Sequence, residues 1–410
     1  MEVRISRFFR PSFFIGLMSL LIWVIYQSIS PMTYQKLFWS PKTGDLLSST
    51  LMLLVILITV LFCYIGEKVS WRSRLSSQSS SGYEIVDLPR WWITSALIIC
   101  LLAYLVWFGI GAVRANGFLQ IYALYRADAF YVKEVILAPI PGITSFTQLG
   151  VIALPLALLN KRMGRLEQTL LVAIFVLALL RSFLFSERLA LLEIIIPVFI
   201  VSVTKRGLHF AQILRSFSLF VVFVMLFFII NESRRSFTAR GITDFADVFL
   251  LGIYRFFGYY LTSVNNYGLA LSNYDFAFPF NFTFSSLWSL PGMGNLYQIL
   301  FPGKQFDAPE LLAFNRLNPE LNVFTTVGYW VMEYSSLATL IVAALYGFTS
   351  GLIYSKAKES SYWLSFYSIW FIGILEFMRI YYLGSPRVFI PFVFFAVTLL
   401  VARSYLRSSR

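Results

Sequence analysis

About ten apolar runs, each long enough to cross a bilayer, dominate this chain of 410 residues. A membrane-spanning helix needs about 20 apolar residues, because the hydrocarbon core offers no water to its backbone. Only 13% of the residues are charged, against about 25% in a typical soluble domain. We therefore predict an all-α polytopic membrane protein that forms a single integral-membrane domain over 1–410. The runs occupy residues 12–30, 47–66, 91–113, 139–160, 168–185, 187–204, 214–231, 326–354, 362–383 and 387–404.

An even number of spans places both termini on the same side of the membrane. The connections 67–90, 161–167, 205–213 and 355–361 then share that side, and all of them are short and rich in Lys and Arg. Such connections are typically cytoplasmic. We therefore predict cytoplasmic termini. Much of the net charge of +13 is explained by this topology, so no nucleic-acid partner is needed.

Two segments on the opposite side are too long to be simple turns. Residues 114–137 mix aromatic and polar side chains, which predicts an interfacial helix. Residues 232–325 begin with an amphipathic, aromatic-rich stretch and continue with many Pro and Gly residues, which predicts amphipathic helices followed by an irregular, folded-back loop. Ordered connections of this length usually act as lids or binding elements.

Several ionisable residues lie where the topology disfavours them. Arg residues at the non-cytoplasmic side oppose the positive-inside bias, and a charge at the centre of a span costs about 2.5–3.5 kcal/mol. Such residues usually face the bundle interior and serve a ligand. Glu376 and Arg379 are three apart and could pair. The cations are Arg181, Arg188, Arg234, Arg235, Arg240, Arg255, Arg316, Arg379 and Arg387; the acids at similar depth are Glu193, Glu333 and Glu376.

These residues predict a cationic pocket at the outer leaflet, roofed by the long loop. Arg forks match phosphate oxygens, so a lipid with a pyrophosphate head group fits the pocket, and the loop aromatics offer faces for sugars. A structural alternative stays open. Arg181 and Arg387 could simply extend to the interface, and Glu193 could form a purely structural pair with Arg188.

Some chemistries lack support in the sequence. There is no Walker A motif, no dinucleotide-binding glycine motif after a strand and no cluster with metal-ligand spacing. The sequence therefore points to neither a cofactor nor a metal. The lone histidine, His209, lies in a cytoplasmic connection away from the predicted pocket.

Three segments resemble the bacterial O-antigen polymerase (Wzy-type) family of oligosaccharide repeat unit polymerases. The first is Ser186-Glu187-Arg188 ahead of an apolar helix. The second runs from Asn322 through Thr325, Thr326 and Gly328 to Glu333-Tyr334-Ser335, and many members have Asp-Phe-Gly in place of these last three residues. The third runs from Leu345 through Gly347 and Gly351 to Tyr354.

The resemblance implies a GT-C-like membrane glycosyltransferase of the bacterial inner membrane. It would polymerise undecaprenyl-pyrophosphate-linked repeat units at the periplasmic face, with a flippase and a chain-length regulator as further partners. The implied roles are pyrophosphate binding by Arg188, Arg234, Arg235, Arg240 and Arg379, proton acceptance by Glu333, Glu376 or Glu193, and glycan binding by Asn322, Thr326 and Tyr260.

Two other functions stay open. A transporter or flippase of lipid-linked oligosaccharides would also place Arg in a cavity, although transporters are often built from internal repeats, and this chain shows none. The related O-antigen ligases carry a functional His in a large periplasmic loop, and 232–325 contains no His. That difference favours the polymerase over the ligase.

Overall fold

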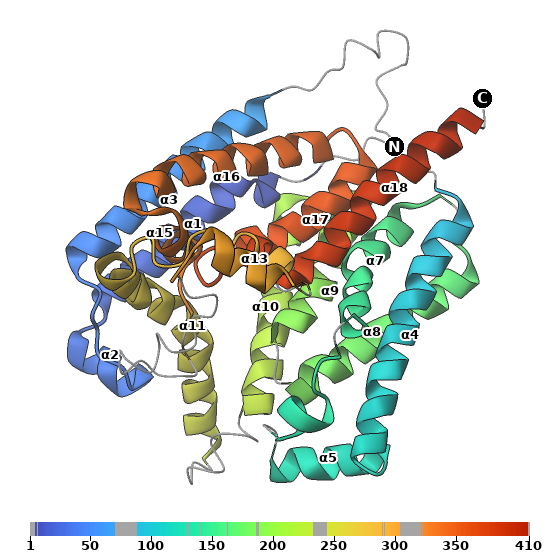
Figure 1. Ribbon diagram of the computed structural model, residues 1–410, viewed down its shortest axis with the longest axis horizontal. Coiled ribbons are helices and arrows are strands. Elements are labelled where there is room, and N and C mark those ends of the chain that lie inside the picture. Colours follow the sequence, from blue (N-terminus) through green and yellow to red (C-terminus); the bar gives the residue numbers. More distant parts are fainter. Residues whose placement is uncertain are drawn as a thin grey trace.

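The computed structural model is helical throughout the part of the chain that it describes, where no strand is found (Figure 1). The described residues are 5, 7–69, 88–128, 131–140, 142–161, 163–185, 188–232, 244–288, 290, 292–303, 321 and 323–408.

Six of the described helices are long and apolar enough to cross a membrane. This confirms the predicted all-helical fold in the described residues and supports a multi-pass membrane protein, while the count of ten spans and the GT-C-like architecture stay predictions. The six are α1 (Pro11–Ser28), α3 (Leu46–Lys68), α4 (Arg90–Arg114), α8 (Arg165–Phe185), α16 (Ser336–Ala357) and α18 (Phe389–Ser408).

The other four apolar runs also form helices. Two are shorter than a span: α7 (Leu149–Leu159), which follows a 3-10 turn, and α17 (Ser361–Leu375). The remaining two are α9 (Arg188–Arg206) and α10 (Phe210–Glu232). The run 326–354 is divided because Ser335 has a φ of 73°, which separates α15 (Thr326–Tyr334) from α16.

The four basic connections meet at one end of the bundle. Lys358 donates to the Glu67 carbonyl at 3.5 Å, the Arg90 guanidinium lies 2.6 Å from the Glu167 carboxylate, and Lys205 donates to the Leu158 carbonyl at 2.9 Å. The end of α3, the start of α4 and the end of α18 all lie on the upper side of Figure 1, although well apart, and α5 (Phe118–Ala127) lies at the bottom. The arrangement agrees with the predicted topology, and cytoplasmic termini stay a prediction.

The described parts of the two long segments fold largely as helices. In α5, Leu119 is 88% exposed and Phe118 is 65% exposed, while Ile121 and Tyr125 are buried. The interfacial position of α5 stays a prediction. Within 232–325, the amphipathic stretch forms α11 (Phe245–Asn273), which packs against α1, α3, α10 and α15. The chain then folds back through the short helices α12 (Ser285–Trp288) and α13 (Met293–Leu300).

Glycines allow α3 and α16 to pack with their backbones in contact. A Cβ atom on Gly351 would lie 2.1 Å from the Cys63 carbonyl oxygen, and one on Gly347 would lie 2.3 Å from the Thr59 carbonyl oxygen. Helices in lipid associate through such small residues, because lipid gives no hydrophobic drive for association. The third segment of the family resemblance thus has a packing role in this fold.

We expect Gly351→Ala to destabilise the protein by about 1–3 kcal/mol, the usual cost of overpacking. Chemical denaturation in detergent micelles measures this change. Gly109→Ala in α4 is the matched control, because a Cβ atom there meets nothing within 4 Å. Equal stability of the two variants would contradict the close packing of α3 on α16.

Candidate functional site

The site is built around an interruption after α17. The helix ends at Leu375, and the next turns are irregular. Irregular backbone inside a membrane protein must find hydrogen-bond partners within the protein. Thr326 supplies two of them, because its N–H donates to the Phe377 carbonyl at 3.0 Å and its hydroxyl donates to the Ile380 carbonyl at 2.9 Å. The Ser263 hydroxyl of α11 donates to the Met378 carbonyl. α11 and α15 thereby hold the interruption in place.

Glu376 and Arg379 form a buried ion pair in this irregular segment. The Arg379 Nη1 lies 2.7 Å from the Glu376 Oε2, and the two side chains are 12% and 0% exposed. The Tyr260 hydroxyl donates to the Glu376 Oε1 at 3.4 Å, and the Arg379 guanidinium lies 4.9 Å from the centre of the Tyr259 ring. The predicted pairing is confirmed, although the two residues lie in the turn beyond α17.

Arg379 keeps bonding capacity beyond this pair. Its Nε is buried and has no hydrogen-bond acceptor among the described residues. A buried N–H without a partner costs about 1–3 kcal/mol. An anionic ligand oxygen would recover part of that cost.

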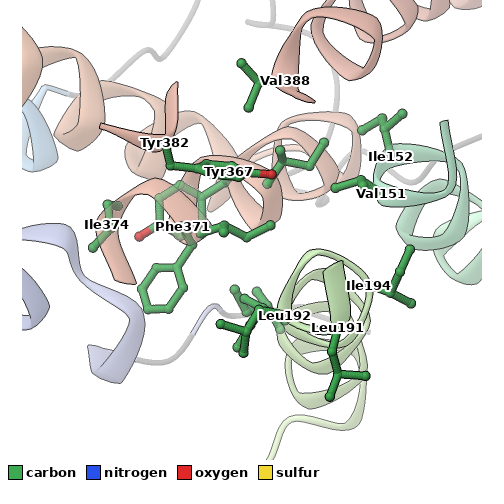
Figure 2. Close-up of a cluster of buried hydrophobic side chains, with 14 of the residues drawn as sticks. Val151, Ile152, Leu191, Leu192, Ile194, Tyr367, Phe371, Ile374, Tyr382 and Val388 are labelled. Atoms are coloured by element: carbon green, nitrogen blue, oxygen red, sulfur yellow. The ribbon is translucent and has the colours of Figure 1, made fainter. Parts of the chain in front are cut away.

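A second ion pair, between a half-buried Arg and a buried Glu, joins the segment before α18 to α9. The Arg387 Nη1 lies 3.3 Å from the Glu193 Oε2, and the Tyr382 hydroxyl donates to the Glu193 Oε1 at 3.2 Å. Figure 2 shows the apolar side chains that pack around this region, with Leu192 from α9 and Phe371 from α17. The structure therefore pairs Glu193 with Arg387, which is 194 residues away in the sequence. The Arg188 side chain, the partner considered from the sequence, lies outside the described part of the chain.

Two of the three described Arg residues at this site face a carboxylate. Arg379 and Arg387 each face one carboxylate, and Arg181 donates to the Thr147 hydroxyl at 3.2 Å and lies over the Trp107 ring. Beyond Arg181, a net positive pocket would depend on cations elsewhere. Arg234, Arg235 and Arg240, together with Asn322, lie outside the described residues, so the predicted surplus of positive charge and this glycan contact stay predictions.

An apolar groove of about 150 Å³ lies beside the Glu376–Arg379 pair. Leu21 and Ile25 of α1 and Phe257 of α11 line it and are 37–50% exposed, so the groove opens on the outer surface of the helix bundle. Tyr260 belongs to both features, because its ring lines the groove and its hydroxyl bonds to Glu376. The lining residues are Phe14, Met18, Leu21, Ile22, Ile25, Leu192, Phe217, Val221, Phe256, Phe257, Tyr260, Leu261 and Leu375.

Glu333 lies in a separate cluster that fixes the folded-back loop. Its Oε1 accepts the Thr283 N–H at 2.7 Å, its Oε2 accepts the Thr283 hydroxyl at 2.9 Å, and that hydroxyl also accepts the Tyr334 hydroxyl. The carboxyl group is fully buried, and burial raises its pKa to about 8. α15, which carries Glu333, precedes the span α16.

The structure thus brings together only part of the predicted site. Glu193, Glu376, Arg379 and Tyr260 surround the segment between α17 and α18, and Thr326 supports it with a hydroxyl that is already bonded. Sequence reasoning missed Tyr382 and Thr283, because their partners are 189 and 50 residues away. Arg387 was noted only as a cation near a helix end. No short motif marks contacts over such distances.

Comparison with known proteins adds no relative to this description. The chain matches no protein-family model, no curated protein and no solved structure.

We expect Arg379→Gln to destabilise the protein by about 3–5 kcal/mol, because it leaves the Glu376 charge buried without its cation. The double variant Glu376→Gln with Arg379→Gln should recover more than half of that loss, since no unpaired charge then remains. Chemical denaturation in detergent micelles measures both. Additive effects of Glu376→Gln and Arg379→Gln would contradict the ion pair.

Glu333 should make stability depend on pH. Its pKa is about 8 in the folded protein and about 4.5 in the unfolded chain, so the folded state binds the proton more tightly. The stabilisation is complete below pH 4.5 and is lost as the pH rises toward 8. We expect Glu333→Gln to flatten the fall of the unfolding midpoint between pH 5 and pH 8. The control Glu134→Gln, at an exposed acid, should leave the fall unchanged; an unaltered profile in Glu333→Gln would refute the assignment.

Proposed function

We propose that this protein is a membrane glycosyltransferase that polymerises undecaprenyl-pyrophosphate-linked oligosaccharide repeat units. The donor is the growing lipid-linked chain, and the acceptor is a single lipid-linked repeat unit. The enzyme would lie in the bacterial cytoplasmic membrane with both termini in the cytoplasm, and a flippase and a chain-length regulator would be its partners. The proposal rests on the family resemblance of the sequence, and one structural observation supports it.

That observation is the apolar groove, whose lining residue Tyr260 also bonds to the buried carboxylate of the Glu376–Arg379 pair. A lipid-linked pyrophosphate has a long hydrocarbon chain attached directly to an anionic head group. The groove between α1, α10 and α11 suits the hydrocarbon, and Tyr260 connects it to Glu376 and Arg379. The buried Nε of Arg379 would donate to a phosphate oxygen.

The residues of this cluster suit a transfer in which little acid–base help is needed. The acceptor hydroxyl oxygen forms a bond to the anomeric carbon of the donor, and the bond from that carbon to the pyrophosphate oxygen breaks. Arg379, with Arg188, Arg234, Arg235 and Arg240 as further candidates, would stabilise the negative charge on the departing undecaprenyl pyrophosphate. The hydroxyl proton passes to a carboxylate, for which Glu376, Glu333 and Glu193 are the candidates.

The competing functions predict different products. A flippase would move a lipid-linked oligosaccharide across the bilayer without lengthening it, and a ligase would transfer the glycan to a different acceptor lipid. An assay with single repeat units as both donor and acceptor separates the three functions.

We expect purified protein, in nanodiscs with undecaprenyl-pyrophosphate-linked repeat units of the producing cell, to form a ladder of longer lipid-linked glycans on electrophoresis. Met18→Trp, which fills the groove, should reduce lengthening at least tenfold, because the hydrocarbon chain loses its place. Leu20→Trp on the exposed side of α1 is the matched control and should keep normal activity. Unchanged single units with the wild-type protein would refute the polymerase, and equal activity of the two variants would refute the role of the groove.

A further inference from the structure

A cluster of basic residues at the opposite end of the bundle has no part in the proposed reaction. It lies where the start of α1 meets the ends of α3 and α16. The Ser12 N–H of α1 donates to the Glu67 carboxylate at 3.0 Å, and the Lys358 ammonium donates to the Glu67 carbonyl at 3.5 Å. Ser355 of α16 donates to the Val69 carbonyl at 2.7 Å, which joins the ends of the two helices.

The cations in this cluster outnumber the acids. The positive charges of Arg10 and Arg7 act on the Tyr354 hydroxyl. The charges that act on Lys358 are those of Arg10, Lys68, Glu67 and Glu359. Among the described residues, four cations, Arg7, Arg10, Lys68 and Lys358, thus gather around two acids, so the described part of the cluster carries a positive charge.

Arg10 has an unused donor in this cluster. Its Nε is buried and has no acceptor among the described residues. Arg10 is also the N-cap residue of α1, and its side chain makes no capping hydrogen bond. The backbone N–H groups at the start of a helix favour an anion as well, and Glu67 already uses one of them.

The place of the cluster in the fold indicates the source of such an anion. The cluster lies at the ends of three helices that are long and apolar enough to span a membrane, α1, α3 and α16. Lys68 and Lys358 are exposed and lie over the rings of Tyr64 and Tyr354 at 5.1 and 5.2 Å. Cations that extend over tyrosine rings at span ends are placed at the depth of phospholipid head groups.

We propose that the Arg10–Lys358 cluster binds the phosphate group of an anionic phospholipid at the membrane surface. The Arg10 Nε and the Lys358 ammonium would donate to the phosphate oxygens, and Arg7 and Lys68 would add long-range attraction. The lipid would bridge α1, α3 and α16 at the end where the contacts of Glu67 and the Ser355–Val69 hydrogen bond already join them. The site is distinct from the proposed transferase site, because it shares no residue with the groove or with the Glu376–Arg379 pair.

The test compares lipid binding by two variants with equal charge. The full-length protein in detergent is titrated with phosphatidylglycerol and, separately, with phosphatidylcholine. Native mass spectrometry measures the bound lipid. Arg10→Gln with Lys358→Gln should raise the apparent Kd for phosphatidylglycerol about 30-fold, since each cation near an anionic lipid contributes about 1 kcal/mol. Lys161→Gln with Arg165→Gln, at exposed residues of the same end, should change it less than threefold.

Two further arms identify the source of the phosphate. Inorganic phosphate at 10 mM, used as a competitor, should not displace phosphatidylglycerol from the wild-type protein. If inorganic phosphate does displace phosphatidylglycerol, the site binds a soluble anion instead of a lipid. Equal weakening in the two double variants would show charge attraction without a defined site and would overturn the proposal.

The unfolding midpoint of each variant shows whether it is still folded. Arg10→Lys is a milder variant, because it keeps the positive charge and loses the Nε donor, and it should still weaken binding.

Discussion

The structure depends on keeping buried charges and backbone groups satisfied in a bundle that is otherwise apolar. The break after α17 frees carbonyl groups at Phe377, Met378 and Ile380, and donors from α11 and α15 take them. The same break places Glu376 and Arg379 side by side, with the Glu376 side chain fully buried. Irregular backbone and an ion pair are both costly inside a membrane protein, and the cost is accepted mainly where a ligand or a mechanism needs them.

The two ends of the bundle use their charges differently. At the end where the basic connections meet, Lys and Arg side chains reach neighbouring carbonyls and acids and leave a surplus of positive charge. Around the break after α17, the described Arg residues are matched by carboxylates. The composition alone suggests a uniformly basic protein, whereas the structure separates a basic surface from a neutral, buried cluster.

Part of this arrangement could be predicted from the sequence. Apolar runs such as 12–30 and 47–66 indicate spans because lipid imposes a length on them, and the pairing of Glu376 with Arg379 follows from their spacing. The partners of Glu193 and Glu333 could not be predicted, because Arg387 and Thr283 reach them only through the tertiary fold. The division of the run 326–354 also escaped prediction, because Ser335 is an unusual residue at a positive φ. Gly347 and Gly351 suggested a family motif, and their packing partner, α3, is visible only in three dimensions.

The central claim is that the groove between α1, α10 and α11 holds the hydrocarbon of a lipid-linked substrate whose head group reaches Arg379. Photocrosslinking with an undecaprenyl pyrophosphate that carries a diazirine near its pyrophosphate end tests the claim directly, with adducts located by peptide mass spectrometry. The account predicts adducts on Met18, Phe256 or Leu261, which line the groove, and competition by unlabelled undecaprenyl pyrophosphate. Adducts spread over the exposed faces of α4 and α8, without competition, would contradict it.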